Sequence, residues 1–104
     1  MSYILTNAEV AEALYLESDY DTARLTRYAA VASSFIKEKT GWDFAADAER
    51  EPLAIECAVQ YVRQLHFGAG GYNREHDYTF GIVGLLVDLN TIAQRKIAAA
   101  VVAP

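Results

Sequence analysis

Residues 52–67 read PLAIECAVQYVRQLHF, and this stretch decides the fold because its apolar side chains do not keep to one side of a helix. The apolar positions cover most of a helical circumference and are Leu53, Ala54, Ile55, Cys57, Ala58, Val59, Tyr61, Val62 and Leu65. The polar residues Glu56, Gln60, Arg63 and Gln64 form one strip. A helix that is apolar nearly all round is typical of a core. We therefore expect the other elements to pack around this helix.

Both ends of the central helix are marked in the sequence. Pro52 suits the first helical position, because the N–H that proline lacks would have no intrahelical partner there. Gly68 suits the left-handed position just past the helix end. The sequence therefore predicts a helix over residues 52–67.

A short helix is expected near the N-terminus. Thr6 and Glu9 have the spacing of a capping box, in which each side chain satisfies a backbone N–H at the helix start. The helix is therefore predicted to begin at Asn7, and a turn-forming cluster after it predicts an end near residues 15–17.

A longer helix is predicted over residues 22–40. Its apolar residues recur at helical spacing and are Leu25, Tyr28, Ala29, Ala32, Phe35 and Ile36. Asp19 or Asp21 can cap its start, and Gly41 stands where a C-terminal cap is expected. Trp42 and Phe44 follow this cap, and we expect them to fold back and seal the core.

Beyond the central helix, residues 68–79 contain three glycines in four positions and show no helical or strand period, which predicts a long flexible loop. Ile82, Leu85, Leu86, Leu89 and Ile92 then restore a helical stripe. Residues 97–104 are apolar but lack a polar face, so we expect a tail that needs a surface to lie on.

The predicted fold is one all-α domain of 104 residues, a small bundle of about four helices over residues 1–96 with the flexible loop and the C-terminal tail. The connector 43–51 is expected to be a surface link with a turn of helix. The predicted core consists of Val10, Leu14, Leu25, Tyr28, Phe35, Ile36, Ile55, Val59, Val62, Leu65, Leu85, Leu86 and Leu89.

Composition narrows the classes of function. Hydrophobic residues make up 53% and charged residues 22%, and no apolar run of about 18 residues is present, so we expect a soluble protein rather than a membrane protein. The start of the chain lacks the pattern of a secretory signal. The single cysteine, Cys57, is expected to be a buried thiol in a reducing cytoplasm. The net charge of −5 disfavours tight binding to DNA phosphates or anionic lipids.

The sequence shows no motif for a nucleotide, a metal or a nucleophile. The glycines at 68, 70 and 71 lack the Lys and Ser/Thr of a phosphate-binding loop. Cys57 and His66 lie about 180° apart on one helix, so they cannot share an ion. We interpret His66 as a residue at the helix-end dipole, and the polar strip as a solvated or interface surface. We expect no enzymatic activity, no cofactor and no metal.

Three groups of residues are candidates for an interface. Ala23, Ala30 and Ser34 belong to a small-residue side of the long helix, which lets another helix approach either inside the subunit or between copies. Tyr72, Arg74 and Tyr78 place aromatic and charged side chains in the loop, the composition that interfaces favour. Ile97, Val101 and Val102 are the apolar side chains of the tail.

The order of these elements resembles the small head-tail connector, or adaptor, proteins of tailed bacteriophages and prophages. The matching features are the capped helix at 6–14, the acidic turn at 18–21, the long helix ending in Lys39-Thr40-Gly41-Trp42, the Pro-led apolar helix, the variable loop and the segment FGIVGLL at 80–86. The resemblance implies a helical-bundle subunit of the head-tail junction of the virion, assembled in the cytoplasm of the bacterial host.

In proteins similar to this chain, the subunits form a homo-oligomeric ring, twelvefold on the portal protein. The ring extends the DNA channel, through which DNA passes without sequence-specific binding, and it docks the next tail or stopper protein. The alternative function is a small helical DNA-binding or regulatory protein of phage origin. A DNA-binding regulator needs a basic recognition helix, and none of the predicted helices has that composition.

Overall fold

The computed structural model describes residues 3–17, 20–67 and 80–102, with the side chains of Phe80 and Val102 excepted. These ranges form α1 (Asn7–Ala13), α2 (Thr22–Thr40), the single 3₁₀ turn η1 (Phe44–Ala46), α3 (Pro52–Phe67) and α4 (Phe80–Val102). No strand occurs in the described ranges. The prediction of a small all-α bundle is confirmed.

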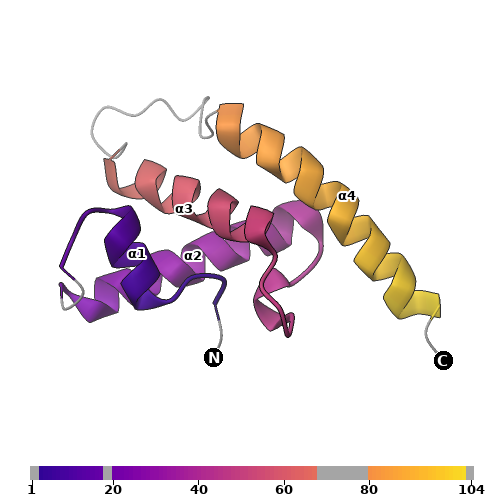
Figure 1. Cartoon of the computed structure of the whole chain (residues 1–104), viewed down its shortest axis with the longest axis horizontal. Coiled ribbons are helices and arrows are strands. Elements are labelled where there is room, and N and C mark those ends of the chain that lie inside the picture. The colour runs from indigo at the N-terminus through magenta and orange to yellow at the C-terminus, as the bar shows by residue number, and fades with distance from the viewer. Residues whose placement is uncertain (1–2, 18–19, 68–79, 103–104) are drawn as a thin grey trace.

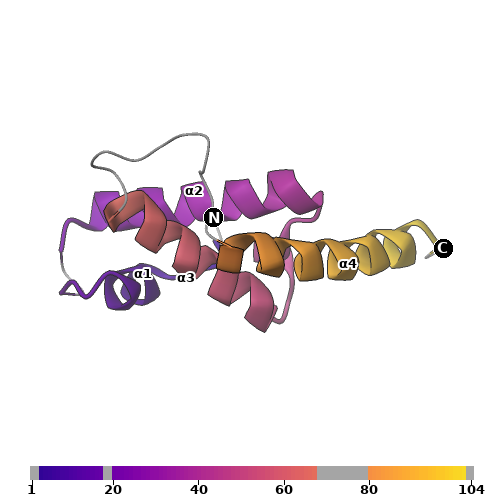
Figure 2. The same cartoon turned by 90° about the horizontal axis from the view of Figure 1, so that it is seen from above.

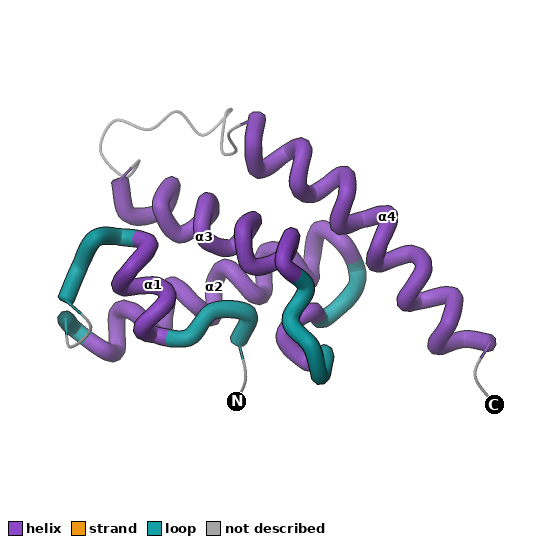
Figure 3. Tube along the Cα trace, in the orientation of Figure 1, coloured by secondary structure: helices purple, strands orange, loops and turns teal. Residues whose placement is uncertain are grey.

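Helix α3 is the centre of the bundle, as its apolar circumference predicts. It packs against α1, α2 and α4, and α2 also contacts α1 and α4. Figure 1 shows α3 between α1 and α4, with α2 crossing behind, and Figure 2 shows the C-terminal half of α4 extending away from the other helices. The Cα trace in Figure 3 shows the connector between α2 and α3, which contains η1.

The predicted start of α1 is confirmed, and its predicted end is two to four residues too late. The Thr6 hydroxyl accepts from the Glu9 N–H, and the Glu9 carboxylate accepts from the Thr6 N–H, so both halves of the capping box are present. The helix ends at Ala13 because Tyr15 takes a left-handed backbone conformation with φ 60°. The N–H of Leu16 then bonds the Ala11 carbonyl, as in a Schellman cap.

The predicted bounds of α2 and α3 are confirmed. These bounds could be predicted because the residues that start and end a helix act locally. Asp21 caps α2 by accepting from the Arg24 N–H at 3.2 Å. Gly41 ends it with φ 79° and donates its N–H to the Lys37 carbonyl at 2.7 Å. Phe44 in η1 is 2% exposed, and Trp42 packs against the core, which confirms that these two aromatic residues seal this end of the bundle.

Most of the predicted core is confirmed. Val10, Leu14, Leu25, Phe35, Ile36, Val62 and Leu89 are buried, whereas Tyr28, Ile55, Val59, Leu85 and Leu86 are half-buried and pack against them. Leu65 is also only half-buried. The core further contains Ile4, Leu5, Ala11, Ala13, Ala29, Ala32, Phe44, Ala54, Cys57, Ala58, Ile82 and Ala93.

The prediction of a tail separate from the last helix is wrong for residues 97–102, because α4 continues to Val102. Residues 98–100 are all alanine, the residue type with the highest intrinsic helix propensity, so nothing in the sequence stops the helix at residue 96. Ile97 also lies near the end of α2, since a Cβ added to Gly41 would come 3.8 Å from Ile97 Cδ1. The predicted loop 68–79, the cap at Gly68 and residues 103–104 lie outside the described residues.

Candidate interaction surfaces

The predicted small-residue side of α2 faces outward. Ala23 and Ser34 are exposed, and Ala30 is half-buried. These exposed positions are accessible to a helix of another copy. The neighbouring Ser33 instead faces the interior, where its hydroxyl accepts from the Ile4 N–H at 2.9 Å. Small residues on both sides of one helix thus have different roles.

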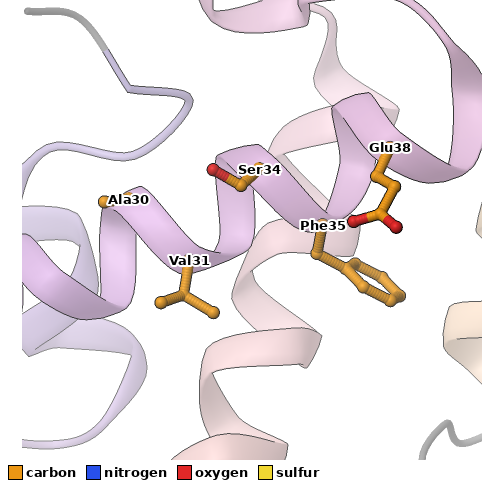
Figure 4. A pocket seen from close by; sticks show the side chains of 5 residues that line it. All are labelled: Ala30, Val31, Ser34, Phe35 and Glu38. Atoms are coloured by element: carbon orange, nitrogen blue, oxygen red, sulfur yellow. The ribbon is translucent and has the colours of Figure 1, made fainter.

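A shallow depression of about 300 Å³ lies on this side of α2, and we call it the α2 groove. It is lined by Ala30, Val31, Ser34, Phe35 and Glu38, which Figure 4 shows along two and a half turns of the helix. The Phe35 ring stacks on Tyr61 of α3 with ring centroids 4.0 Å apart and an interplanar angle of 6°. Stacking on Tyr61 therefore fixes the Phe35 ring that lines the groove.

Aromatic and cationic side chains gather where α1 and α3 end and α2 begins. This group, the aromatic end, consists of Tyr15, Arg24, Tyr28, Arg63, His66 and Phe67. Tyr15 and Phe67 have ring centroids 6.4 Å apart and are 78% and 58% exposed. The Arg63 guanidinium lies 5.6 Å from the Tyr15 ring centroid. The aromatic end is thus an apolar surface beside positive charge.

Contacts between helices hold the aromatic end in place. Arg63 Nε donates to the Ala13 carbonyl at 2.9 Å and so satisfies a free carbonyl at the end of α1. His66 lies in the last turn of α3, as predicted, and its Nδ1 is 3.0 Å from the Tyr28 hydroxyl. The grouping of Tyr15 with Phe67 could not be predicted from the sequence, because their proximity depends on the left-handed turn at Tyr15.

The polar strip of α3 is more structural than predicted. Gln60 donates to Glu56 Oε1 at 3.3 Å, and Arg63 supports α1 as described. A Cβ on Gly81 would lie 2.5 Å from Gln60 Oε1, so the glycine lets the first turn of α4 approach this side of α3. The strip therefore borders α1 and α4 rather than facing solvent along its whole length.

The thiol of Cys57 lies in the core, and two polar side chains of a second depression are engaged in structural contacts. Cys57 is fully buried, and burial raises the pKa of its thiol to about 11. A second depression, of about 370 Å³, lies between α1 and α3 and is lined by Leu5, Glu9, Glu12, Ala13, Tyr15, Ile55, Val59 and Arg63. Its Glu9 already pairs with Arg50, and its Arg63 donates to a backbone carbonyl.

The described ranges also hold no cluster of metal-ligating side chains and no helix that could cross a membrane. Three or more His, Cys, Asp or Glu side chains do not gather there in an arrangement for a metal ion. None of the four helices combines the length and apolarity that a membrane crossing requires.

The remaining predicted interface residues divide between described and undescribed parts of the chain. Tyr72, Arg74 and Tyr78 lie outside the described residues. Ile97 is half-buried near Gly41, whereas Val101 is 79% exposed on the last turn of α4. The backbone of Val102 is helical, and its side chain is among those not described.

Helix α4 also exposes apolar side chains that the sequence analysis missed. Val87 is 63% exposed and Val83 is 44% exposed, and a Cβ added at Gly84 would have no atom within 4 Å. Both valines lie off the stripe that enters the core, which is the sequence signal that could have identified them. The outward side of α4 therefore exposes two valines beside polar and charged side chains.

Comparison of the chain with protein-family models, with curated proteins and with solved structures found no match.

Proposed function

We propose that this chain is a head-tail connector subunit of a tailed bacteriophage or prophage, which forms a ring under the portal, extends the DNA channel and docks the next tail or stopper protein. The order of capped helices, acidic turn and Pro-led central helix carries the resemblance to such proteins. The helix bounds on which that order depends, at α2 and α3, agree with the sequence pattern.

The observation that supports an assembly role most directly is the grouping of exposed apolar side chains. Single exposed hydrophobic residues are ordinary, but contiguous apolar patches mark interaction sites. Here Tyr15 and Phe67 form one group at the aromatic end, and Val83 and Val87 form another on α4. In an assembled subunit, contacts with neighbouring proteins would bury these apolar side chains.

The acidic charge agrees with a channel function. Each phosphate that a protein neutralises adds affinity for DNA through counterion release. A channel that lets DNA pass must not hold phosphates tightly. A chain with net charge −5 contributes few such contacts.

The test is the size of the protein alone and with its portal protein. The subunit and the portal encoded by the same phage or prophage are purified separately, mixed, and analysed by native mass spectrometry and by negative-stain electron microscopy. The expected result is a ring of this chain on the portal that does not form when the portal is omitted. Absence of any complex at micromolar concentrations of both proteins would overturn the proposal.

The α2 groove supplies a matched pair of variants for this test. Ser34→Arg places a large charged side chain in the groove, so it is expected to reduce ring formation without loss of helix content. Ala46→Arg places the same side chain at an exposed position in η1 and serves as the control. Equal assembly of both variants would remove the α2 groove from the contact between subunits.

A further inference from the structure

We propose that the outward side of α4 is a two-fold interface at which two copies of this chain pair through antiparallel α4 helices. The inference starts from the position of each side chain around the helix, at about 100° per residue. The core side of α4 contains Ile82, Leu89 and Ala93, all fully buried. Directly opposite lie Gly84, Val87, Thr91 and Ala98, all exposed. We call these four residues the α4 ridge.

The α4 ridge is small and flat, which lets a second helix approach closely. Gly84 and Ala98 have almost no side chain, and the hydroxyl of Thr91 is turned back onto its own helix, where it donates to the Val87 carbonyl at 3.3 Å. Helices pack at axis separations of about 8–10 Å, and the shorter separations require small residues at the contact. The ridge therefore has the shape of a helix-packing surface.

The two flanks of the ridge differ in chemistry. On one flank lie Asp88 and Arg95, seven residues apart, so they share one direction from the helix axis and are about 10 Å apart along it. Both are exposed, and neither forms an ion pair with another described residue. On the other flank lie Val83 and Val101, with Asn90 and Gln94 between them, all exposed. One flank is charged and the other is uncharged, with a valine at each end.

This arrangement is complementary to itself when two α4 helices run antiparallel. In an isologous pair, residues at equal distances on either side of the axis meet. Asp88 and Arg95 lie at equal distances from the point between Thr91 and Ile92, and Val83 and Val101 are symmetric about Ile92. Gly84 and Ala98 are symmetric about Thr91. All three pairs thus share one centre to within half a residue.

The flanks also meet correctly in this geometry. In an antiparallel two-fold pair, each flank of one helix faces the same flank of its partner. Asp88 therefore meets Arg95 of the second copy twice, and the valines meet each other. A parallel two-fold pair would instead place this charged flank against the other flank of the partner, so Asp88 and Arg95 would have no oppositely charged partner. The charges thus select the antiparallel orientation.

A second copy accounts for features that other occupants do not. An anionic lipid surface would be repelled by Asp88, and an unrelated apolar helix would leave Asp88 and Arg95 without partners. Ala98 and Val101, which are exposed on the last turn of α4, would be covered by the first turns of the partner's α4.

This inference does not rest on the proposed function. A two-fold pair is closed, so it cannot by itself grow into a ring. If both proposals hold, the pair is the form of the free subunit, and ring formation on the portal uses other surfaces or separates the two copies. The pairing is therefore tested on the isolated chain, without portal protein.

The first experiment measures the mass of the chain by sedimentation equilibrium from about 1 µM to about 100 µM. The unaltered chain is expected to dimerise. Asp88→Arg and Arg95→Asp should each weaken the dimer about tenfold or more, because each places like charges against each other twice. The double variant Asp88→Arg/Arg95→Asp should restore it. Arg27→Asp, a charge reversal at an exposed position of α2, is the control.

The second experiment determines the orientation by disulfide cross-linking. Cys57 is buried, so the unaltered chain should not cross-link. Thr91→Cys lies next to the two-fold axis and should form a dimer on oxidation, since a disulfide needs the two Cβ atoms about 4 Å apart. Ala98→Cys lies on the same ridge, but two copies of it would be about 20 Å apart in an antiparallel pair, so it should not cross-link.

Several outcomes would overturn the proposal. These are a chain that stays monomeric over the whole concentration range, a dimer that ignores the single charge reversals, and a double variant that does not recover. Efficient cross-linking of Ala98→Cys would overturn the antiparallel orientation. Circular dichroism confirms that each variant is folded, so that loss of pairing is not loss of fold.

Discussion

The ammonium of Lys96 on α4 lies 3.2 Å from Oδ2 of Asp47, a carboxylate oxygen buried in the connector after η1. The other oxygen of Asp47 accepts from Trp42 Nε1 at 3.0 Å, and the Lys96 ammonium lies 5.9 Å from the Trp42 ring centroid. Lys96 is the charge that compensates the buried oxygen in the described part of the chain. These three residues join α4 to the connector between α2 and α3.

Replacement of Lys96 is therefore expected to destabilise the fold. Lys96→Met keeps an apolar stem and removes the ammonium, which leaves Asp47 Oδ2 buried without a partner at a cost of about 1–3 kcal/mol. The free energy of unfolding, measured with urea, should fall by that amount. In the double variant Asp47→Asn/Lys96→Met the buried charge is absent, so the loss should be smaller than the sum of the single losses. Additive losses would show that the two groups do not interact.

Charge at the centre of α3 should be far more damaging. Val62 is fully buried on α3, and an unpaired buried charge costs several kcal/mol against a total stability of about 5–15 kcal/mol. Val62→Asp is expected to abolish the cooperative thermal transition and most of the helical circular dichroism. Val31→Asp, at a partly exposed position of α2, should leave the transition in place. An unchanged melting temperature for Val62→Asp would show that the core is assigned incorrectly.

The fold could be predicted from sequence where the signals are local. Asp21 and Gly41 mark the ends of α2, and Pro52 marks the start of α3, because caps act within one turn. The left-handed backbone of Tyr15 was not predictable, since that conformation normally favours glycine. The backbone strain at Tyr15 is offset because the resulting turn lets Leu16 cap α1 and pack on the core.

The interaction surfaces were harder to predict because the two ends of α4, residues 80–87 and 97–102, contain only apolar residues. In those turns no polar side indicates which residues enter the core. The predicted stripe contained the buried Ile82 and Leu89 together with Leu85, Leu86 and Ile92, which are half-buried, and it missed the buried Ala93. The small-residue side of α2 was identified, but only the tertiary packing separates inward Ser33 from outward Ser34.

Acid should weaken the N-terminal cap through Glu9. The hydrogen bond from Arg50 holds the pKa of the Glu9 carboxyl below its usual value, and the Thr6 N–H acts in the same direction. A lowered folded-state pKa contributes stability above the unfolded pKa of about 4.3 and loses it as pH falls through the folded value. Urea unfolding from pH 6 to pH 3 should therefore show a decline that Glu9→Gln reduces. Glu12→Gln, three residues further along α1, is the control variant for this decline in stability.

Alkali should act on Cys57 in the opposite sense. Burial raises the pKa of the thiol to about 11, whereas in the unfolded chain it ionises near its ordinary value. Its contribution to stability is present below the unfolded pKa and falls as pH rises toward the folded value. The stability difference between the unaltered chain and Cys57→Ala should shrink over that range. A thiol reagent at pH 8 should modify the folded protein much more slowly than the protein in urea.

Binding to free duplex DNA should be weak. With a net charge of −5, the chain is expected at the weak end of non-specific binding, about 10⁻⁴ M at physiological salt. Fluorescence anisotropy with a labelled duplex measures this directly. Submicromolar affinity that falls steeply with added salt would favour the DNA-binding alternative over the connector.

The hydrogen bond from Arg63 to the Ala13 carbonyl also affects the order in which the chain folds during synthesis. A helix of seven residues such as α1 is too short to persist alone in water, because nucleation costs more than so few hydrogen bonds return. The side chains that hold α1, those of Arg50 and Arg63, lie about forty and fifty positions further along the chain. The segment synthesised first is therefore expected to become helical only when α2 and α3 can pack against it. Translation order and folding order run in opposite directions for this element.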